Sequence, residues 1–594
     1  MNRLEALRHE MRSEGIDAII IPSSDPHNSE YVAPYWQSRS WISGFNGSAG
    51  TAVVTLDEEA LWTDSRYFLQ AERQLSERSA AEGCRWQLMK EGLQETPTII
   101  EWLMRKMSSC GGTTVAIDGM LMTYAEALAM QKELSRIGVT LRTNYDAMRM
   151  VWHDRPCLPM GEIYVKPTGE TVTEKLTRIR ACMQREHCDA HVLADLMGIA
   201  WTLNLRGSDV KQTPVFVAYL YVGQETATLF CADTLTAEAR QAMKQAGVDV
   251  RPYEAFAQYL RECDGSRIMV DSSSTSYTLY NIIKAHAIDI PSPVIAFKAV
   301  KNAYEIEGMR QSMLRDGVAM VKFLRWLKPA VERGGETEIS VSDKLESLRR
   351  ESTEFRDLSF STICGYNAHG AIVHYSATAE TDMPLKPEGL LLVDSGAQYT
   401  DGTTDITRTI PLGPLTDEMR RAYTLVLKAH IALATTPFPD GTCGTQIDAL
   451  ARAEVWRGGM NYLHGTGHGV GWCLAVHEGP HSIRMDWRPA PLHEGMTVTD
   501  EPGVYVAGAF GIRTENTMLV TRYDKLPPYD GVPFLRLEPL TLCPIPIEPI
   551  VQDMLTPVEV DYLNDYHARV ERELMPLLED EADRQWLKQA CGAV

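Results

Sequence analysis

Four carboxylates and one histidine in the last third of the chain constrain its fold more than any other feature. They are Asp394, Asp405, His468, Glu501 and Glu515, spaced 11, 63, 33 and 14 residues apart in Gly-rich or apolar, strand-like segments. Carboxylates that a fold gathers cannot all stay ionised at neutral pH unless cations neutralise them. Four oxygen ligands with one imidazole suit a pair of divalent ions such as Mn²⁺, Co²⁺ or Zn²⁺. We therefore predict a fold that closes around two metal ions.

The sequence segments around these residues identify a protein family more specifically than the spacing of the residues does. The segments read VDSGAQYTDGTTDITRT from Val393, HGTGHGVG from His464, DEPGVY from Asp500 and GIRTEN from Gly511. In order and spacing they resemble the catalytic domain of the metallopeptidase family that includes methionine aminopeptidase, prolidase and aminopeptidase P. The first segment is most similar to the long, three-domain, cytosolic type of Xaa-Pro aminopeptidase.

The resemblance implies a role for each of the five residues. Asp394 would chelate one metal, Asp405 and Glu515 would bridge both, and His468 with Glu501 would complete the second. Glu515 could also take a proton from the attacking water and so act as a catalytic residue. Each carboxylate taken alone is more often a solvated surface group, so the prediction depends on all five occurring in order.

Four further residues receive roles from the same resemblance. His464 and His477 match histidines that hold the substrate carbonyl and stabilise the oxyanion. Arg513 matches an arginine that hydrogen-bonds a ligand carboxylate and fixes its geometry. His374 occupies the place of a catalytic-site histidine before the first aspartate, although its spacing alone is typical of a core or surface histidine.

One motif in this region points to a different chemistry. His477 and His481 complete the H-E-x-x-H pattern of zinc proteases. That pattern binds zinc only on a helix, where residues four apart share a face. Gly479 and Pro480 lie in its middle, and a proline inside a helix costs about 3 kcal/mol. We therefore reject the zinc-protease interpretation.

Composition narrows the class of protein. With 594 residues the chain is too long for one core, and its length predicts about three or four domains. A formal charge of −21 argues against nucleic acid and anionic membranes as partners. The 12 cysteines include no Cys-x-x-Cys pair, which fits a reducing compartment. Without an 18-residue apolar run or a signal peptide, we expect a cytoplasmic protein.

The first 300 residues contain a faint internal repeat. The matches are Leu7, Met11 and Asp17 with Ile179, Met183 and Asp189 at an offset of 172, and Gly47 with Gly207 at an offset of 160. A chance match of so few identities is the alternative. We predict two similar α/β domains over residues 1–155 and 156–300, which the resemblance identifies as creatinase-N-like. Thr171 and Glu174 form a capping-box pattern that begins a helix in the second domain.

Residues 301–594 mix strands and helices without a regular βαβ order. We expect a long helix from Asn302 that Pro329 stops, strands over 390–393, 406–410, 496–500 and 517–520, and helices over 416–434 and 445–460. This mixture favours an α+β domain with an antiparallel sheet. In the family it is the pita-bread fold, whose two pseudo-symmetric halves hold the metals between them. The whole chain is thus an α+β and α/β multidomain protein.

The last residues, 540–594, form a C-terminal extension that we expect to be helical. Thr556, Pro557 and Glu559 combine a helix cap, a first-turn proline and a capping-box glutamate. The apolar, Pro-rich run Cys543–Val551 must pack on its own domain or on a partner. By resemblance the extension contributes to dimerisation, so we predict a homodimer.

The function that the resemblance implies is release of the N-terminal residue from peptides with proline in second place. Two divalent metal ions, most plausibly Mn²⁺, would serve as cofactors. Prolidase, which cuts Xaa-Pro dipeptides, is the main alternative, and the duplicated N-terminal half argues against it. Methionine aminopeptidase lacks that half. Non-catalytic relatives that bind histones or RNA, and metal-free creatinase, have lost metal ligands that this chain keeps.

Overall fold

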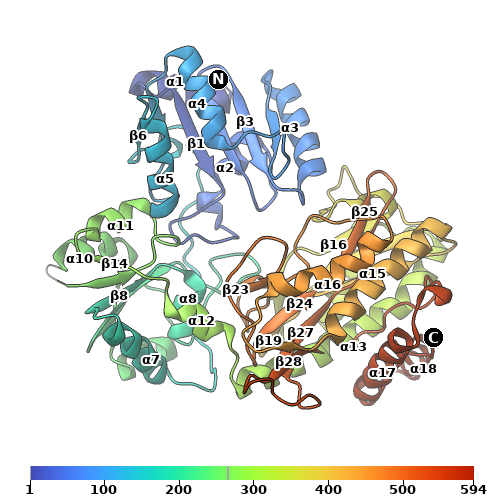
Figure 1. Cartoon of the computed structure of the whole chain (residues 1–594). Helices are drawn as coiled ribbons and strands as arrows, with labels where there is room; N and C mark the ends of the chain where they lie inside the picture. Colours follow the sequence, from blue (N-terminus) through green and yellow to red (C-terminus); the bar gives the residue numbers. More distant parts are fainter. Residues whose placement is uncertain (1, 264–265) are drawn as a thin grey trace. The chain divides into compact units, whose positions relative to one another are not determined.

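A computed structural model describes residues 2–263 and 266–594 of the chain. The chain divides into two compact units, Met1–Ile295 and Ala296–Val594, and Figure 1 shows strands and helices mixed in each. Unit 1 holds two six-stranded sheets, in which parallel and antiparallel strand pairs are mixed. In the larger sheets of unit 2, neighbouring strands are antiparallel.

The first domain of unit 1 is a sheet with helices on both faces. The strand order is β4 (Gln87–Lys90), β3 (Glu59–Thr63), β2 (Thr51–Thr55), β1 (Ala18–Pro22), β5 (Thr114–Ala116) and β6 (Thr140–Arg142). Neighbouring residues of β1 face opposite cores, because successive side chains of a strand alternate. Ile19 and Ile21 pack with α1 (Arg3–Glu14), α2 (Ser38–Ser43), α3 (Phe68–Glu82) and α6 (Ala147–Val151). Ile20 packs with α4 (Ile99–Cys110) and α5 (Tyr124–Ser135).

The second domain repeats this sheet strand for strand. Its order is β12 (Val248–Pro252), β11 (Ala227–Cys231), β10 (Ala218–Gly223), β8 (Ala190–Leu193), β13 (Ile268–Val270) and β14 (Ala287–Asp289). As in the first domain, the inner strand β8 pairs parallel on one side and antiparallel on the other. The predicted duplication is therefore confirmed in the topology of the two sheets.

Helices surround this second sheet as well. They are α7 (Val172–Arg185), α8 (Leu196–Thr202), α9 (Ala237–Gln245), α10 (Phe256–Glu262) and α11 (Tyr277–Ile283). Thr171 caps α7 and accepts from the Glu174 amide, while the Glu174 carboxylate accepts from the Thr171 amide, as the capping-box pattern predicted. A short pair, β7 (Tyr164–Val165) and β9 (Leu205–Arg206), lies outside the sheet.

The first half of unit 2 packs two helices on a small sheet. After α12 (Pro293–Ala299), α13 (Ala303–Arg333) and α14 (Glu338–Arg349) share one apolar core with β16 (Ile363–Tyr366), β17 (Leu390–Ser395) and β20 (Ile406–Pro411). A second three-stranded sheet joins β15 (Phe355–Leu358), β18 (Ala397–Tyr399) and β19 (Gly402–Thr403).

The prediction that Pro329 stops the long helix is wrong. α13 runs through Pro329 and ends at Arg333, before Gly334. A proline inside a helix removes one backbone donor and crowds the preceding turn. Leu327, Ala330 and Val331 on either side of the proline are all buried, so core packing holds the last turn in place.

The second half of unit 2 is a larger sheet under two helices. Its order is β21 (Phe438–Pro439), β28 (Phe534–Pro539), β27 (Asn516–Arg522), β24 (Thr497–Asp500), β22 (Gly467–Gly469) and β23 (Glu478–Ile483), with α15 (Asp417–Thr435) and α16 (Gly444–Arg457) in the same core. The strands and helices predicted here are present, but α16 ends three residues earlier than expected. Gly458 and Gly459 follow it, and Gly459 has a φ of 76° that favours glycine.

The C-terminal extension packs on the same core of unit 2. α17 (Pro557–Leu574) begins with the predicted cap and capping box, and α18 (Glu581–Ala590) follows it. Cys543, Ile545 and Ile550 of the apolar run before α17 are buried within unit 2. The run therefore packs on its own domain, and its apolar character does not call for a partner.

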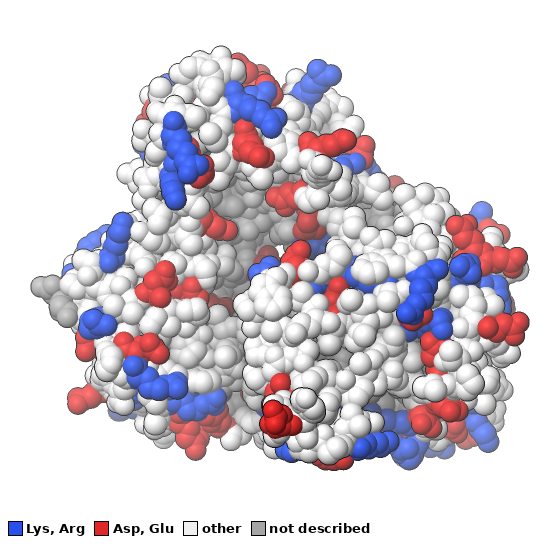
Figure 2. All heavy atoms as spheres, viewed as in Figure 1, with Lys and Arg blue, Asp and Glu red and all other residues white. Residues whose placement is uncertain are grey.

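Charge is spread rather than gathered on the face that Figure 2 shows. Acidic and basic side chains of the described residues are interspersed there over both units, although the chain carries a net charge of −21. None of the helices among the described residues is long and apolar enough to cross a membrane.

Candidate metal centre

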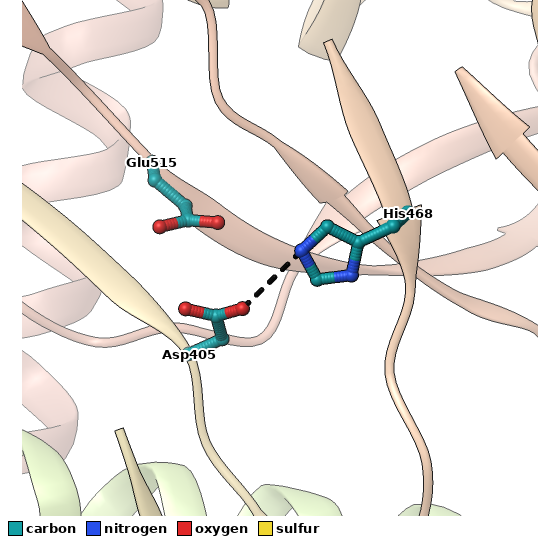
Figure 3. Close-up of side chains that lie close together, drawn as sticks. All are labelled: Asp405, His468 and Glu515. Atoms are coloured by element: carbon teal, nitrogen blue, oxygen red, sulfur yellow. Dashed lines mark ion pairs between the residues drawn. The ribbon is translucent and has the colours of Figure 1, made fainter. Parts of the chain in front are cut away.

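Three of the predicted ligands lie close enough to share a metal ion. Asp405, His468 and Glu515 each offer one ligand atom, and these atoms lie within 4.8 Å of one another. Figure 3 shows both carboxylates and the imidazole turned toward the same point, with Nε2 of His468 3.4 Å from Oδ2 of Asp405. Asp405 immediately precedes β20, Glu515 immediately precedes β27, and His468 lies on β22. The two halves of unit 2 thus both contribute ligands.

The other two predicted ligands border this group. Glu501 follows β24, and its Oε1 lies 3.5 Å from Nε2 of His468. Asp394 is in β17, beside Thr407 of β20, and is 8 % exposed. Its Oδ2 accepts a 2.5 Å hydrogen bond from Nη2 of Arg513. Its other oxygen, Oδ1, is buried and has no hydrogen-bond partner among the residues that the structure describes.

The carboxylates of this centre oppose one another's ionisation. Burial raises the pKa of Asp405 and of Glu515 well above the usual range, and the neighbouring carboxylates raise it further. Burial also raises the pKa of Glu501 to about 7, with Asp394 adding to the effect and Arg513 opposing it. Such a set holds either protons or cations.

This arrangement fits two divalent ions. The four positive charges of such a pair equal the charge of four ionised carboxylates, and hard or borderline ions take carboxylate oxygen with a single imidazole. The unsatisfied Oδ1 of Asp394 would gain a metal as its partner. Asp394, Asp405, His468, Glu501 and Glu515 would hold the ions, and their individual roles stay predictions.

The predicted Arg513 and one side chain outside the predicted set, Thr407, orient the ligands. Thr407 donates from Oγ1 to Oε2 of Glu515 at 2.7 Å and accepts from Nε of Arg513 at 3.1 Å. Arg513 is 1 % exposed and thus holds Asp394 directly and Glu515 through Thr407. Thr407 lies inside the DITRT string, so the motif contains it, but nothing in the sequence indicated its contact with Glu515.

His464 is held by Tyr505, which sequence reasoning also missed. Nη1 of Arg513 donates to the Tyr505 hydroxyl at 2.7 Å, and that hydroxyl lies 2.8 Å from Nε2 of His464. Nδ1 of His464 lies 2.7 Å from the Gly465 carbonyl, which can only accept, so Nδ1 carries a proton. The Tyr505 hydroxyl, which accepts from Arg513, thus links Arg513 to His464. The DEPGVY string contains Tyr505 but does not reveal this contact.

His477 lies against a metal ligand. Its ring centroid is 4.3 Å from that of His468, edge to face. The next residue, Glu478, is buried and accepts from Nζ of Lys298 at 2.6 Å and from Nζ of Lys301. The H-E-x-x-H pattern is not helical, as its glycine and proline predicted: His477 precedes strand β23, and the other four residues belong to that strand.

His374 lies in the loop beside the centre. It is half-buried, and the carbonyl of the preceding Val373 accepts from Nη2 of Arg513 at 3.4 Å. The structure therefore places His477 and Arg513 against the ligands, links His464 to Arg513 through Tyr505, and ties the His374 loop to Arg513. The catalytic roles given to the three histidines stay predictions.

The fold and the gathered ligands define a pita-bread metallopeptidase. The family model of Metallopeptidase family M24 matches residues 307–522, and that of the C-terminal region of these peptidases matches 533–594. Two models of the Creatinase/Prolidase N-terminal domain match residues 3–151 and 154–305.

Relatives that match the full length of the chain identify its subgroup within the family. The chain is 38 % identical to Xaa-Pro aminopeptidase 1 of Dictyostelium discoideum over 99 % of its own length and 95 % of that protein. It is 39 % identical to aminopeptidase P2 of Arabidopsis thaliana over 96 % of its length and 85 % of that protein. The chain belongs to metallopeptidase family M24 and, within it, to the Xaa-Pro aminopeptidases.

A solved structure covers the whole chain as well. The X-prolyl aminopeptidase of Caenorhabditis elegans, described as a cytosolic enzyme with a di-nuclear active site, superposes with a TM-score of 0.93 at 34 % identity. The alignment covers 100 % of this chain and 99 % of that one. The expected architecture of two creatinase-N domains and a pita-bread domain is confirmed.

Proposed function

We propose that this enzyme uses two metal ions to release the N-terminal residue from peptides with proline in second place. The observation that carries the proposal is the cluster of Asp405, His468 and Glu515, with Glu501 and Asp394 beside it. Non-catalytic and metal-free relatives lack this complete set. Release of the first residue before proline is what the name of the Dictyostelium discoideum relative, Xaa-Pro aminopeptidase 1, states for that protein.

Each side chain around the metal pair has a separate role in the reaction. Two bound divalent ions would activate a water molecule and polarise the scissile carbonyl. Glu515, held by Thr407, accepts the proton that the attacking water loses. His477 stabilises the charge that develops on the carbonyl oxygen. His464, whose Nε2 lies 2.8 Å from the Tyr505 hydroxyl, holds the substrate carbonyl.

The direct test is mass spectrometry of Arg-Pro-Pro incubated with the protein and Mn²⁺. Release of free arginine with Pro-Pro as the second product is the expected result. No cleavage in protein shown to contain two ions would contradict the proposal.

Substrate length separates this proposal from prolidase. Contacts beyond the proline support positioning at the reacting centre, so a longer peptide gains rate from them. We expect a higher kcat/KM for Arg-Pro-Pro than for Arg-Pro at equal metal loading. A ratio that favours the dipeptide would assign the chain to the prolidases and leave the two-metal mechanism intact.

The metal we propose is Mn²⁺, because a mostly oxygen ligand set suits it, with Co²⁺ and Zn²⁺ as alternatives. Activity of metal-free protein reloaded with each ion, together with the metal content of protein purified without added metal, tests the choice. We also propose a cytoplasmic location, since the Caenorhabditis elegans relative is described as cytosolic. Fractionation of cells that express the tagged protein tests it.

We further propose a homodimer that forms through unit 2. Trp456, Leu463, Met485 and Trp487 of this unit are 48–65 % exposed, and burial of large apolar side chains against a partner is favourable. Light scattering at micromolar concentration should give twice the chain mass for the natural protein, and the chain mass for Trp487→Glu. A monomeric natural protein would contradict the proposal.

A further inference from the structure

A buried carboxylate outside the metal centre organises the loop that carries His374. Glu338 is the first residue of α14 and is fully buried. Its Oε1 accepts from the Tyr366 amide at 2.8 Å, and its Oε2 accepts from the Tyr375 hydroxyl at 2.8 Å and from the Met383 amide at 3.2 Å. Nδ1 of His369 lies 3.0 Å from both oxygens.

The partners of Glu338 lie on both sides of His374 in the sequence. Tyr366 and His369 precede it, and Tyr375 and Met383 follow it. The backbone adds a further tie, because the Glu338 amide donates to the Met383 carbonyl at 3.1 Å. One carboxylate therefore closes the segment 366–383 into a loop with His374 near its middle.

The opposite side of this loop touches the metal centre. The Val373 carbonyl accepts from Arg513, which also holds Asp394. Tyr375 is buried with Ile363 and Leu392, and Tyr505 packs against the same group. The His374 backbone is thus held between Arg513 on one side and Glu338 on the other.

Glu338 is suited to this task as a carboxylate rather than as an amide. Both of its oxygens receive hydrogen-bond donors, and among the described residues its only ion-pair partner is His369. A glutamine in its place would turn an NH₂ group toward at least one of these donors, which leaves buried donors unsatisfied. The loop would then have to move to satisfy them.

We propose that Glu338 is a positioning residue that sets the place of His374 at the metal centre. The inference rests on the proposed function, because it presumes that His374 acts on the substrate. Glu338 itself touches neither the metal ligands nor, by its burial, the substrate. Its effect on the reaction passes through the loop.

The first experiment compares Glu338→Gln with Glu336→Gln in the full-length, Mn²⁺-loaded enzyme. Glu336 lies two residues earlier, and its carboxylate accepts from the Ser340 hydroxyl instead of from the loop. A displacement of about 1 Å at a reacting group costs about 100-fold in rate, so we expect kcat of Glu338→Gln to fall about 10- to 100-fold. KM and the metal content should stay within about twofold of the natural protein. Glu336→Gln should match the natural enzyme.

A double-mutant cycle with His374→Ala separates positioning from general damage. If Glu338 acts through His374, Glu338→Gln should lower kcat by less than about twofold when His374 is already alanine. Losses that multiply in the double variant, an unchanged kcat of Glu338→Gln, or a natural rate in His374→Ala would each overturn the inference. An inactive natural enzyme would instead count against the proposed function.

A measurement that does not depend on catalysis tests the inference even if the natural enzyme is inactive or a variant folds poorly. Limited proteolysis of the segment 366–383 should speed up several-fold in Glu338→Gln and less in Tyr375→Phe, which removes one of the hydrogen bonds to Glu338 together with those of the same hydroxyl to Thr381. Equal cleavage rates in the natural protein and Glu338→Gln would overturn the inference even in an inactive enzyme.

Discussion

Asp209 of unit 1 and the carboxylates of the metal centre in unit 2 are satisfied in opposite ways. In unit 1, Asp209 is 6 % exposed and its oxygens accept from the backbone amides of Gly161 and Val217 at 2.7 and 2.8 Å. In unit 2, Asp405 and Glu515 are as deeply buried, but each faces other carboxylates. The first arrangement is complete with the chain's own donors, whereas the second needs cations from outside.

This difference locates function better than burial alone does. A single buried carboxylate with local donors fixes a turn or a loop and stays satisfied. Several that raise one another's pKa carry a free-energy cost that bound protons or cations remove. The duplicated domains of unit 1 share a sheet topology, and the gathered ligands of the chain all belong to unit 2.

The largest effect should come from removing the metal. Chelation should abolish activity, because every predicted ligand lies between Asp394 and Glu515. Hydrogen exchange should speed up in β17, β20, β22 and β27 of the catalytic unit, since like charges then face one another without cations. The sheets of unit 1 should exchange at their former rates. Full activity in protein shown to be free of metal would end the two-metal hypothesis.

Removing one ligand should have the next largest effect. Glu501→Ala should lose one ion per chain, because the side chain lies 3.5 Å from His468 and would complete the second site. Metal assistance is worth several kcal/mol, so kcat/KM should fall about 100- to 1,000-fold. Glu494→Ala, an exposed glutamate just before β24, serves as the control and should keep both ions. A Glu501→Ala variant with two ions still bound would remove this residue from the ligand set.

The matching change in unit 1 should affect stability and not catalysis. Asp209→Asn turns an amide group toward the backbone donors of Gly161 or Val217, which costs about 1–3 kcal/mol of unfolding free energy. Denaturant unfolding measures that loss, while kcat and metal content should stay unchanged. A Asp209→Asn variant with altered metal content would break the contrast between the units.

Local chemistry explains which parts of this structure the sequence alone could predict. The cap of Thr171 on α7 is read correctly because its partner, Glu174, is three residues away. The metal ligands were predicted as a set because their strings resemble a known family, and three of them, Asp405, His468 and Glu515, lie together in the structure. The long helix was predicted too short at Pro329, because buried neighbours outweigh the helix penalty of proline.

Contacts between residues far apart in the sequence could not be predicted from the sequence alone. Thr407 meets Glu515 over 108 residues, and Glu338 meets Tyr375 over 37. Neither pair leaves a periodic pattern, a cap or a spacing that sequence reasoning could use. The side chains that orient the predicted ligands therefore appear only once the strands and loops are placed.

The last prediction concerns the pH dependence of the stability of unit 1. His191 of β8 is fully buried, with Nδ1 3.0 Å from the Met269 carbonyl and Nε2 2.9 Å from the Ser292 hydroxyl. Burial lowers its pKa to about 4 from an ordinary 6.5, so between these values the unfolded chain binds more protons than the folded one. Stability is therefore present above pH 6.5 and is lost as the pH falls toward 4, by up to about 1.4 kcal/mol per pH unit.

Hydrogen exchange of β8 and β13 peptides between pH 6.5 and 4.5, corrected for the intrinsic rate, measures this loss. His27, whose pKa burial also lowers, contributes to the same slope in unit 1, so His191→Gln should reduce the slope without abolishing it. Glutamine keeps a side-chain donor and acceptor but does not titrate. An unchanged slope in His191→Gln would show that acidification acts on unit 1 through other groups. A change in kcat at pH 7 would show that this histidine of the duplicated half does bear on the catalytic unit, and the separation of roles between the two units would have to be given up.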